Sequence, residues 1–214
     1  MKRLHRGMIL FFLVSISCSG SNINNYQKSR KMIYPVVTKE FEMLDFREYD
    51  SVKRNYSVTL KDNMHVQYMG YSGGYKVTIQ PANSYFSITK LFDDRGYITE
   101  KGLLFNSGGF RKGVWYHFTN GQLSREDNAD KAFPFSFEQL YDYLVKEKIP
   151  LASGHIEYGY QTQIRREVDE KGARWSVEWL KDHTRIPNLI ETITIDGKTG
   201  KIIDKKYTNF SPSR

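Results

Sequence analysis

The sequence predicts an α+β fold, mostly antiparallel β-hairpins with one amphipathic helix packed on a four-strand C-terminal antiparallel sheet. Three observations support this class. The 15 Tyr and 13 Phe among 214 residues favour pleated, half-buried surfaces, and a hydrophobic fraction of 39% suffices for a folded core. Short period-two apolar runs bounded by turn residues fill much of the chain. The period becomes helical after residue 136, and strand-like runs then return.

Residues 1–17 have the pattern of a signal peptide. Lys2, Arg3 and Arg6 form a basic start, and the apolar run 8–16 that follows is nine residues long. Such a run is too short to cross a bilayer but fits the hydrophobic part of a signal peptide. We therefore expect the protein to be exported.

Cys18 is the only cysteine, so the chain cannot form an internal disulfide. The five residues from Val14 to Cys18 resemble the lipobox of bacterial lipoproteins, although Ser15 stands where most lipoboxes carry Leu. The resemblance implies cleavage before Cys18 and a lipid anchor, with acyl chains such as palmitate, on its sulfur. An ordinary secretory cleavage that leaves a free thiol is the alternative.

Residues 18–35 are expected to form the lipidated cysteine and a polar tether. The stretch is rich in Ser and Asn and lacks hydrophobic periodicity. Acidic residues are absent just after Cys18, which by analogy with lipoprotein sorting favours the outer membrane. The predicted membrane contact is therefore the N-terminal lipid anchor, with the folded body facing the periplasm or the cell surface.

The charge of the chain argues against a nucleic-acid partner. The formal net charge is +8, and loss of residues 1–17 removes three basic residues and leaves +5. The remaining Lys and Arg residues are scattered through predicted strands and turns, with no run of four or more. Nucleic-acid binding would need a clustered basic face.

Residues 36–132 are predicted to be rich in β-hairpins. Period-two apolar runs at 56–60, 65–69, 75–79 and 85–88 are separated by Gly, Asn, Asp and Pro. The pair Gly73-Gly74 is interpreted as a hairpin turn, because the Lys-Ser/Thr and helix pattern of a phosphate-binding loop do not follow it.

One segment in this region resembles a known repeat. Residues 113–123, GVWYHFTNGQL, are similar to the hairpin unit of MORN-like repeats, and a degenerate unit lies 25 residues earlier. The resemblance implies stacked hairpins with Gly at the turns, and such modules occur in antitoxin-type proteins. Its aromatic run is the candidate binding surface: Trp115, Tyr116, His117 and Phe118.

Residues 133–214 are predicted to form a helix followed by an antiparallel sheet. Ser136 and Gln139 make a capping box, and Pro150 ends the helix. An apolar stripe with helical spacing follows the cap, formed by Phe137, Leu140, Tyr141, Leu144 and Val145.

Four strands are expected after this helix, at about 154–166, 173–180, 189–196 and 201–207, with a hairpin turn at 196–200. The order of elements and the run I-T-I-D-G-K-T-G-K-I resemble the PepSY-like group of exported bacterial domains. PepSY-like domains are thought to bind and restrain peptidases.

The three residues Trp175, Val177 and Trp179 share one strand face. They are expected to pack under the helix stripe. Exposure as a binding surface is the alternative for the two Trp side chains.

No catalytic constellation emerges from the sequence, and neither a metal nor a cofactor is expected. The His residues are isolated, H-E-x-x-H does not occur, and the chain lacks the alternating strand–helix pattern of an α/β-hydrolase. Pairs of carboxylates next to turn signals are interpreted as solvated loop charges rather than a glycosidase pair; they are Asp93-Asp94, Glu126-Asp127 and Asp169-Glu170.

The leading functional expectation is a non-catalytic envelope lipoprotein that binds another protein. The two resemblances make an immunity protein or a peptidase inhibitor the sharpest form of this expectation. The alternatives are a structural or assembly factor of the outer membrane and an unrecognised hydrolase acting on polysaccharide.

Overall fold

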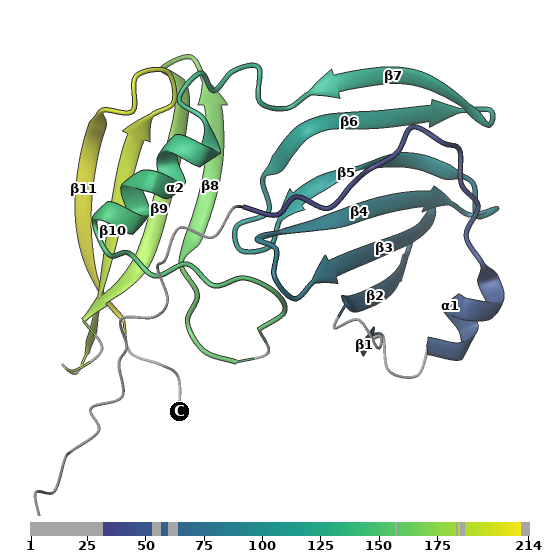
Figure 1. Cartoon of the computed structure of the whole chain (residues 1–214), viewed down its shortest axis with the longest axis horizontal. Helices are drawn as coiled ribbons and strands as arrows, with labels where there is room; N and C mark the ends of the chain where they lie inside the picture. Colours follow the sequence, from purple (N-terminus) through teal and green to yellow (C-terminus); the bar gives the residue numbers. More distant parts are fainter. Residues whose placement is uncertain are drawn as a thin grey trace, which may run out of the picture. The chain divides into compact units, whose positions relative to one another are not determined.

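The computed structural model describes residues 32–52, 57–59, 64–156, 158–182, 184 and 187–210 (Figure 1). These residues belong to one compact unit. The predicted signal peptide and Cys18 lie outside the described residues.

The described chain contains two antiparallel sheets, which confirms the predicted α+β class. The first sheet is a seven-stranded meander in which each strand pairs with the next. Its strands are β1 (Ser57–Thr59), β2 (Met64–Tyr71), β3 (Gly74–Pro81), β4 (Phe86–Asp93), β5 (Ile98–Phe105), β6 (Arg111–Thr119) and β7 (Gln122–Asn128). The second sheet has the order β11-β10-β9-β8. Its strands are β8 (Gln163–Asp169), β9 (Gly172–Asp182), β10 (Asn188–Asp196) and β11 (Ile202–Phe210).

Local turn chemistry accounts for the hairpins that the sequence predicted. Between β6 and β7, Asn120 and Gly121 both have positive φ, at 51° and 78°, as a type I′ turn requires. Between β10 and β11, the Asp196 carboxylate accepts hydrogen bonds from the backbone N–H groups of Lys198 and Thr199. The turn between β2 and β3 contains Gly73, as expected.

The predicted amphipathic helix is α2 (Phe137–Lys146). The Gln139 backbone N–H donates to the Ser136 hydroxyl, and the Ser136 N–H donates to the Gln139 side chain, so the capping box is confirmed. The helix ends four residues before Pro150. Its buried residues pack on Trp175 of β9 and its neighbours, as the alternating pattern of that strand predicted.

The structure differs from the sequence prediction in two elements. A seven-residue helix, α1 (Phe46–Val52), is capped by the Asp45 carboxylate and is too short to show a periodic pattern. The first C-terminal strand starts at residue 163 rather than 154. The Gly154 N–H instead donates to Ser84 O in the turn between β3 and β4.

The boundary expected between residues 132 and 133 falls between the two sheets, yet one hydrophobic core runs across it. The cluster joins residues of the first sheet and its turns to residues of α2 and the second sheet. Its members include Phe86, Phe105, Phe110, Phe137, Leu140, Trp175, Val177 and Ile193. A second cluster packs on one face of the seven-stranded sheet and includes Leu44, Val66, Tyr68, Val77 and Phe118.

Arg166 of β8 lies between the two sheets. Its guanidinium stacks on Phe110, Phe133 and Trp175, with 4.4–4.7 Å to the ring centroids. The Nη1 atom lies 2.7 Å from Asp130 Oδ1 and donates to the carbonyl oxygen of Arg111. Burial lowers the pKa of this guanidinium, while Asp130 opposes the shift.

We expect Arg166→Ala to lower the free energy of unfolding by about 3–5 kcal/mol, since it removes one partner of a buried ion pair and its aromatic contacts. The matched control is Arg165→Ala, which truncates an exposed neighbour on the same strand and should leave the urea midpoint nearly unchanged. Equal midpoint shifts for the two variants would contradict the structural role of Arg166.

Candidate functional site

The four residues of the predicted binding surface lie on β6 and alternate between its two faces. Trp115 is 2% exposed: Arg111 stacks 4.1 Å from its ring centroid, and its indole Nε1 donates to Leu103 O. Phe118 is 6% exposed and belongs to the second core cluster. Trp115 and Phe118 are therefore core side chains, and a partner could reach only Tyr116 and His117.

His117 belongs to an ion-pair network on one face of β5, β6 and β7. Its Nε2 lies 2.9 Å from Asp127 Oδ2, and its Nδ1 lies 3.8 Å from Glu100. Arg125 and Arg111 lie 2.9 Å and 2.6 Å from Asp127 and Glu100 respectively. Arg111 and Arg125 thus each face a carboxylate, and these contacts link the three strands.

Tyr116 points to the other face, where residues 32–45 cross the seven-stranded sheet (Figure 1). We call residues 32–45 the strap. Lys39 of the strap lies 6.0 Å from the Tyr116 ring centroid and 2.7 Å from Glu126 of β7. Met32 and Tyr34 pack against the first core cluster, so the last residues of the expected tether are part of the folded body.

A buried lysine holds the strap on the sheet. The side chain of Lys101 in β5 is 1% exposed, and its ammonium donates to Glu42 Oε1 at 2.7 Å and to Glu40 O. Lys90 of β4 binds the other carboxylate oxygen of Glu42. Burial would raise the pKa of Glu42, but Lys101 and Lys90 outweigh burial and lower it. Glu42 therefore neutralises a cation that the sheet interior could not otherwise hold.

The start of the strap is fixed by a second polar cluster. The Tyr34 hydroxyl donates to Glu138 Oε1 at 2.5 Å, and Lys112 lies 3.1 Å from the same carboxylate. Burial would raise the pKa of Glu138, but the hydrogen bond from Tyr34 and the contact with Lys112 lower it to about 2. Lys112 in turn binds Asp130, the partner of Arg166.

The end of the strap pairs through its backbone with the turn between β4 and β5, and this pairing makes alternate residues face solvent. The Leu44 N–H donates to Gly96 O, and Met43 pairs with Tyr97 in an isolated β-bridge. Leu44 therefore enters the core, whereas Met43 is 61% exposed. Three other exposed apolar side chains belong to the strap, to the start of α1 or to the turn that pairs with the strap, and we call the group of four the strap patch: Phe41, Met43, Phe46 and Tyr97.

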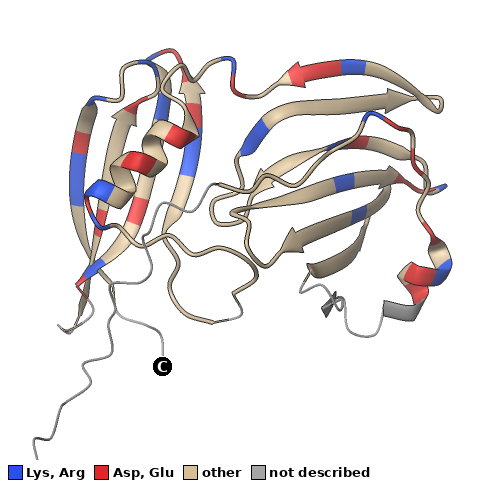
Figure 2. Cartoon of the chain, in the orientation of Figure 1, with Lys and Arg blue, Asp and Glu red and all other residues tan. Residues whose placement is uncertain are grey.

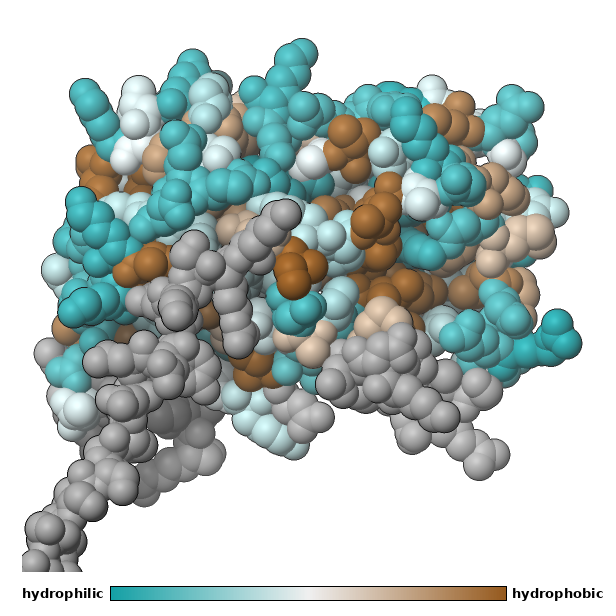
Figure 3. All heavy atoms as spheres, viewed as in Figure 1, coloured by the Kyte–Doolittle hydropathy of each residue, from teal (hydrophilic) through white to brown (hydrophobic). Residues whose placement is uncertain are grey.

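The members of the strap patch are in contact with one another or with the same turn. The rings of Phe41 and Tyr97 are 5.9 Å apart, and the Phe46 ring lies directly against Gly96. The Arg95 guanidinium lies over the Tyr97 ring, 5.0 Å from its centroid. In Figure 3, hydrophobic side chains reach the surface on the face of the sheet that the strap crosses.

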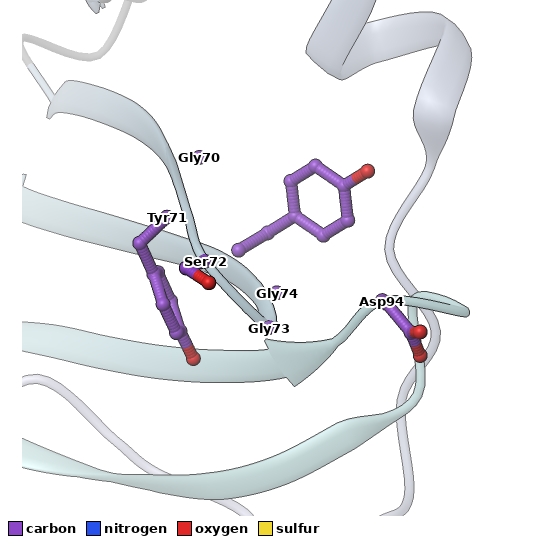
Figure 4. A pocket seen from close by; sticks show the side chains of 7 residues that line it. Gly70, Tyr71, Ser72, Gly73, Gly74 and Asp94 are labelled. Atoms are coloured by element: carbon purple, nitrogen blue, oxygen red, sulfur yellow. The ribbon is translucent and has the colours of Figure 1, made fainter.

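A shallow hollow of about 460 Å³ adjoins the strap patch. Tyr75 lines it and also meets Phe46 edge-on, with ring centroids 5.5 Å apart. Figure 4 shows Tyr71 and Asp94 on either side of the turn that separates β2 from β3. A second hollow, of about 320 Å³, is lined by polar residues of other loops and of the start of β8: Asn106, Ser107, Tyr160, Gln161 and Gln163.

At least one carboxylate of each sequence pair is engaged in an ion pair. Asp93 is bound by Arg95, Asp127 by His117 and Arg125, and Asp169 by Arg174. Burial would raise the pKa of Asp93, but the Tyr97 N–H and Arg95 lower it.

Figure 2 shows both signs of charge interspersed over the strands of both sheets. Within the described residues, no group of three or more His, Cys, Asp or Glu could hold a metal ion, and no helix is long and apolar enough to span a membrane.

Comparisons with protein-family models, with curated proteins and with solved structures each found no match for this chain. The MORN-like and PepSY-like resemblances and the lipobox therefore stay predictions. The strap patch was not predicted from the sequence, although Phe41, Met43 and Phe46 lie close together in it. The sequence does not show that the strap pairs with the turn between β4 and β5, which brings Tyr97 to the same place.

We expect Glu42→Gln to destabilise the protein by about 1–2 kcal/mol, allowing for partial exposure of the carboxylate, because Lys101 then remains buried without a counterion. The matched control is Glu40→Gln, an exposed carboxylate two residues away on the strap, which should not move the urea midpoint. Destabilisation by both variants alike would show that Lys101 does not depend on Glu42.

A pH prediction follows from Glu138, whose pKa falls from an ordinary value of 4.5 to about 2. A lowered pKa in the folded state stabilises the protein above the unfolded value, and this stabilisation is lost as the pH falls. The difference in unfolding free energy between the wild type and Glu138→Gln should be greatest at neutral pH, shrink below pH 4.5 and vanish near pH 2. Urea titrations across this range, with Glu147→Gln on the same helix as the control, measure it. A difference that does not change with pH would contradict the prediction.

Proposed function

We propose that this chain is a non-catalytic lipoprotein of the bacterial outer membrane that binds another protein of the envelope. Its sharpest form is an immunity protein or an inhibitor of a peptidase. The observation that carries the proposal is the strap patch, a group of aromatic and Met side chains that solvent reaches although the backbone beneath them is fixed to the sheet.

The composition of the strap patch supports binding to a protein. Aromatic residues, Met and Arg are enriched at the centres of protein interfaces, and charged residues surround them at the rim. Here Arg95 stacks on Tyr97, while Arg47 and Asp45 are exposed at the start of α1. The patch is held on a rigid support, so binding would cost little ordering of the backbone.

The expected anchor suits the same role. Fourteen peptide units separate Cys18 from Met32, the first residue of the strap. A fully extended chain of this length spans at most roughly 50 Å. A lipid on Cys18 would therefore keep the strap patch within reach of partners at the same membrane.

We expect Met43→Glu to reduce recovery of the partner at least tenfold without lowering stability, because it places a charge at the centre of an apolar surface. The matched control is Val168→Glu, which changes an equally exposed apolar residue on β8 and should leave recovery unchanged. Tagged full-length variants are purified from gently solubilised, crosslinked envelopes, and co-purifying chains are quantified by mass spectrometry.

The outcomes separate the functional candidates. One stoichiometric partner that Met43→Glu loses and Val168→Glu retains supports a dedicated binding protein. Several substoichiometric partners, unaffected by Met43→Glu, would instead favour the assembly factor. The absence of any partner, or equal recovery with both variants, would overturn the proposal. Loss of membrane attachment with Cys18→Ser tests the anchor separately.

A further inference from the structure

We propose that β11 pairs with β11 of a second copy of this chain across a twofold axis, so that two four-stranded sheets join into one of eight strands. β11 forms one edge of its sheet, and its inner side pairs with β10 from Asn188↔Phe210 to Ile195↔Ile202. Among the described residues, β10 is the strand that pairs with it. In the part of the chain that the structure describes, no strand pairs with the outer side of β11, and such an edge is a template for a further strand.

The side chains of β11 are unusually apolar for an edge. Ile203 and Tyr207 are 55% and 57% exposed, and Ile202 and Phe210 are exposed as well. By contrast, β7, an edge of the seven-stranded sheet, exposes one large apolar side chain, Leu123. Exposed apolar residues concentrated on one sheet edge are typical of a surface that is covered in the assembled protein.

Symmetry and side-chain alternation restrict the register. In an antiparallel pair, residues opposite each other point to the same face. If a twofold axis relates the two strands, one residue of β11 must therefore lie opposite the same residue of the second copy. When Lys205 is that residue, Asp204 lies opposite Lys206 of the second copy, and this pair occurs twice. The regular pairing ends at Asp204, because the register of β11 shifts at Ile203.

The two Lys205 side chains would not repel each other strongly at the axis. Each Lys205 ammonium lies 2.9 Å from Glu191 of its own chain. The other carboxylate oxygen of Glu191 binds Lys181, also at 2.9 Å. Glu191 is 1% exposed, so its charge is fixed behind the edge and holds Lys205 toward its own sheet.

Lysines on an edge strand ordinarily prevent pairing with unrelated strands. Lys206 lies 3.1 Å from Asp204 of its own chain. In the register centred on Lys205, the second copy places its own Asp204 and Lys206 against this pair so that the four charges alternate in sign, whereas a strand with a basic residue opposite Lys206 would repel it. These charges therefore favour a second copy of this chain over such a strand.

The first experiment is light scattering on the full chain carrying Cys18→Ser, purified in detergent. We expect a protein mass of twice 25.1 kDa. Lys206→Asp should weaken the dimer at least tenfold, because two carboxylates then face each other at two places. The double variant Asp204→Lys/Lys206→Asp restores the opposite charges and should restore the dimer. Lys146→Asp, on the exposed side of α2, is the matched control.

A crosslink tests the register independently of stability. On the Cys18→Ser background, Lys205→Cys places a single thiol beside its own copy, so oxidation should link the chains rapidly. Asp204→Cys places its thiol opposite a lysine and should link them at least tenfold more slowly. A monomeric chain, a dimer that Lys206→Asp leaves intact, or faster linking from residue 204 would overturn the proposal. None of these outcomes depends on the protein partner proposed above.

Discussion

The buried guanidinium of Arg166 is the interaction on which the arrangement of the two sheets depends. It extends from β8 into a space walled by three aromatic rings from both sides of the expected boundary. Its charge is met by Asp130, which follows β7 in the chain. Because a cation in such a place is costly without its partners, the two sheets are stable only when they are packed together. A backbone hydrogen bond from Ile164 to Ser107, and the close approach of Gly108 to the Ile164 carbonyl, fix the same junction.

A second buried cation, Lys101, fixes the position of the strap in the same way through its ion pair with Glu42. A lysine in the middle of a sheet would be expelled or neutralised unless a carboxylate reached it, and the carboxylate comes from the segment that precedes the sheet. Once Glu42 is fixed, the alternation of the chain decides that Leu44 enters the core and Met43 faces solvent. The strap patch is therefore a consequence of a buried ion pair and is as rigid as the sheet below it.

Much of the fold could be predicted from the sequence because its signals act over a few residues. The capping box of α2 joins residues 136 and 139, and the turn between β10 and β11 closes through hydrogen bonds from Thr199 to Asp196. The packing of Trp175 under α2 followed from two periodic patterns that had to face each other. In each case the physical cause lies within the segment that carries the pattern.

The candidate site could not be predicted, because its contacts join distant parts of the chain. Glu42 and Lys101 are 59 positions apart, and no local pattern marks them as partners. Trp115 looks like a surface aromatic in sequence, yet it is buried because Gly102 on the neighbouring strand leaves room for its ring and Arg111 covers it. Burial of an aromatic side chain on a two-sided sheet depends on such neighbours, which the sequence alone does not identify.

Native-state hydrogen exchange most directly tests the central claim that the two sheets form one cooperative body around Arg166. Amides at the start of β4 and in the middle of β9 belong to different sheets but border the same core. The account predicts that both exchange through one global opening, with equal free energies and equal sensitivity to urea. If β9 exchanged through an opening that left β4 protected, or the reverse, the two sheets would be separate domains and the account would be contradicted.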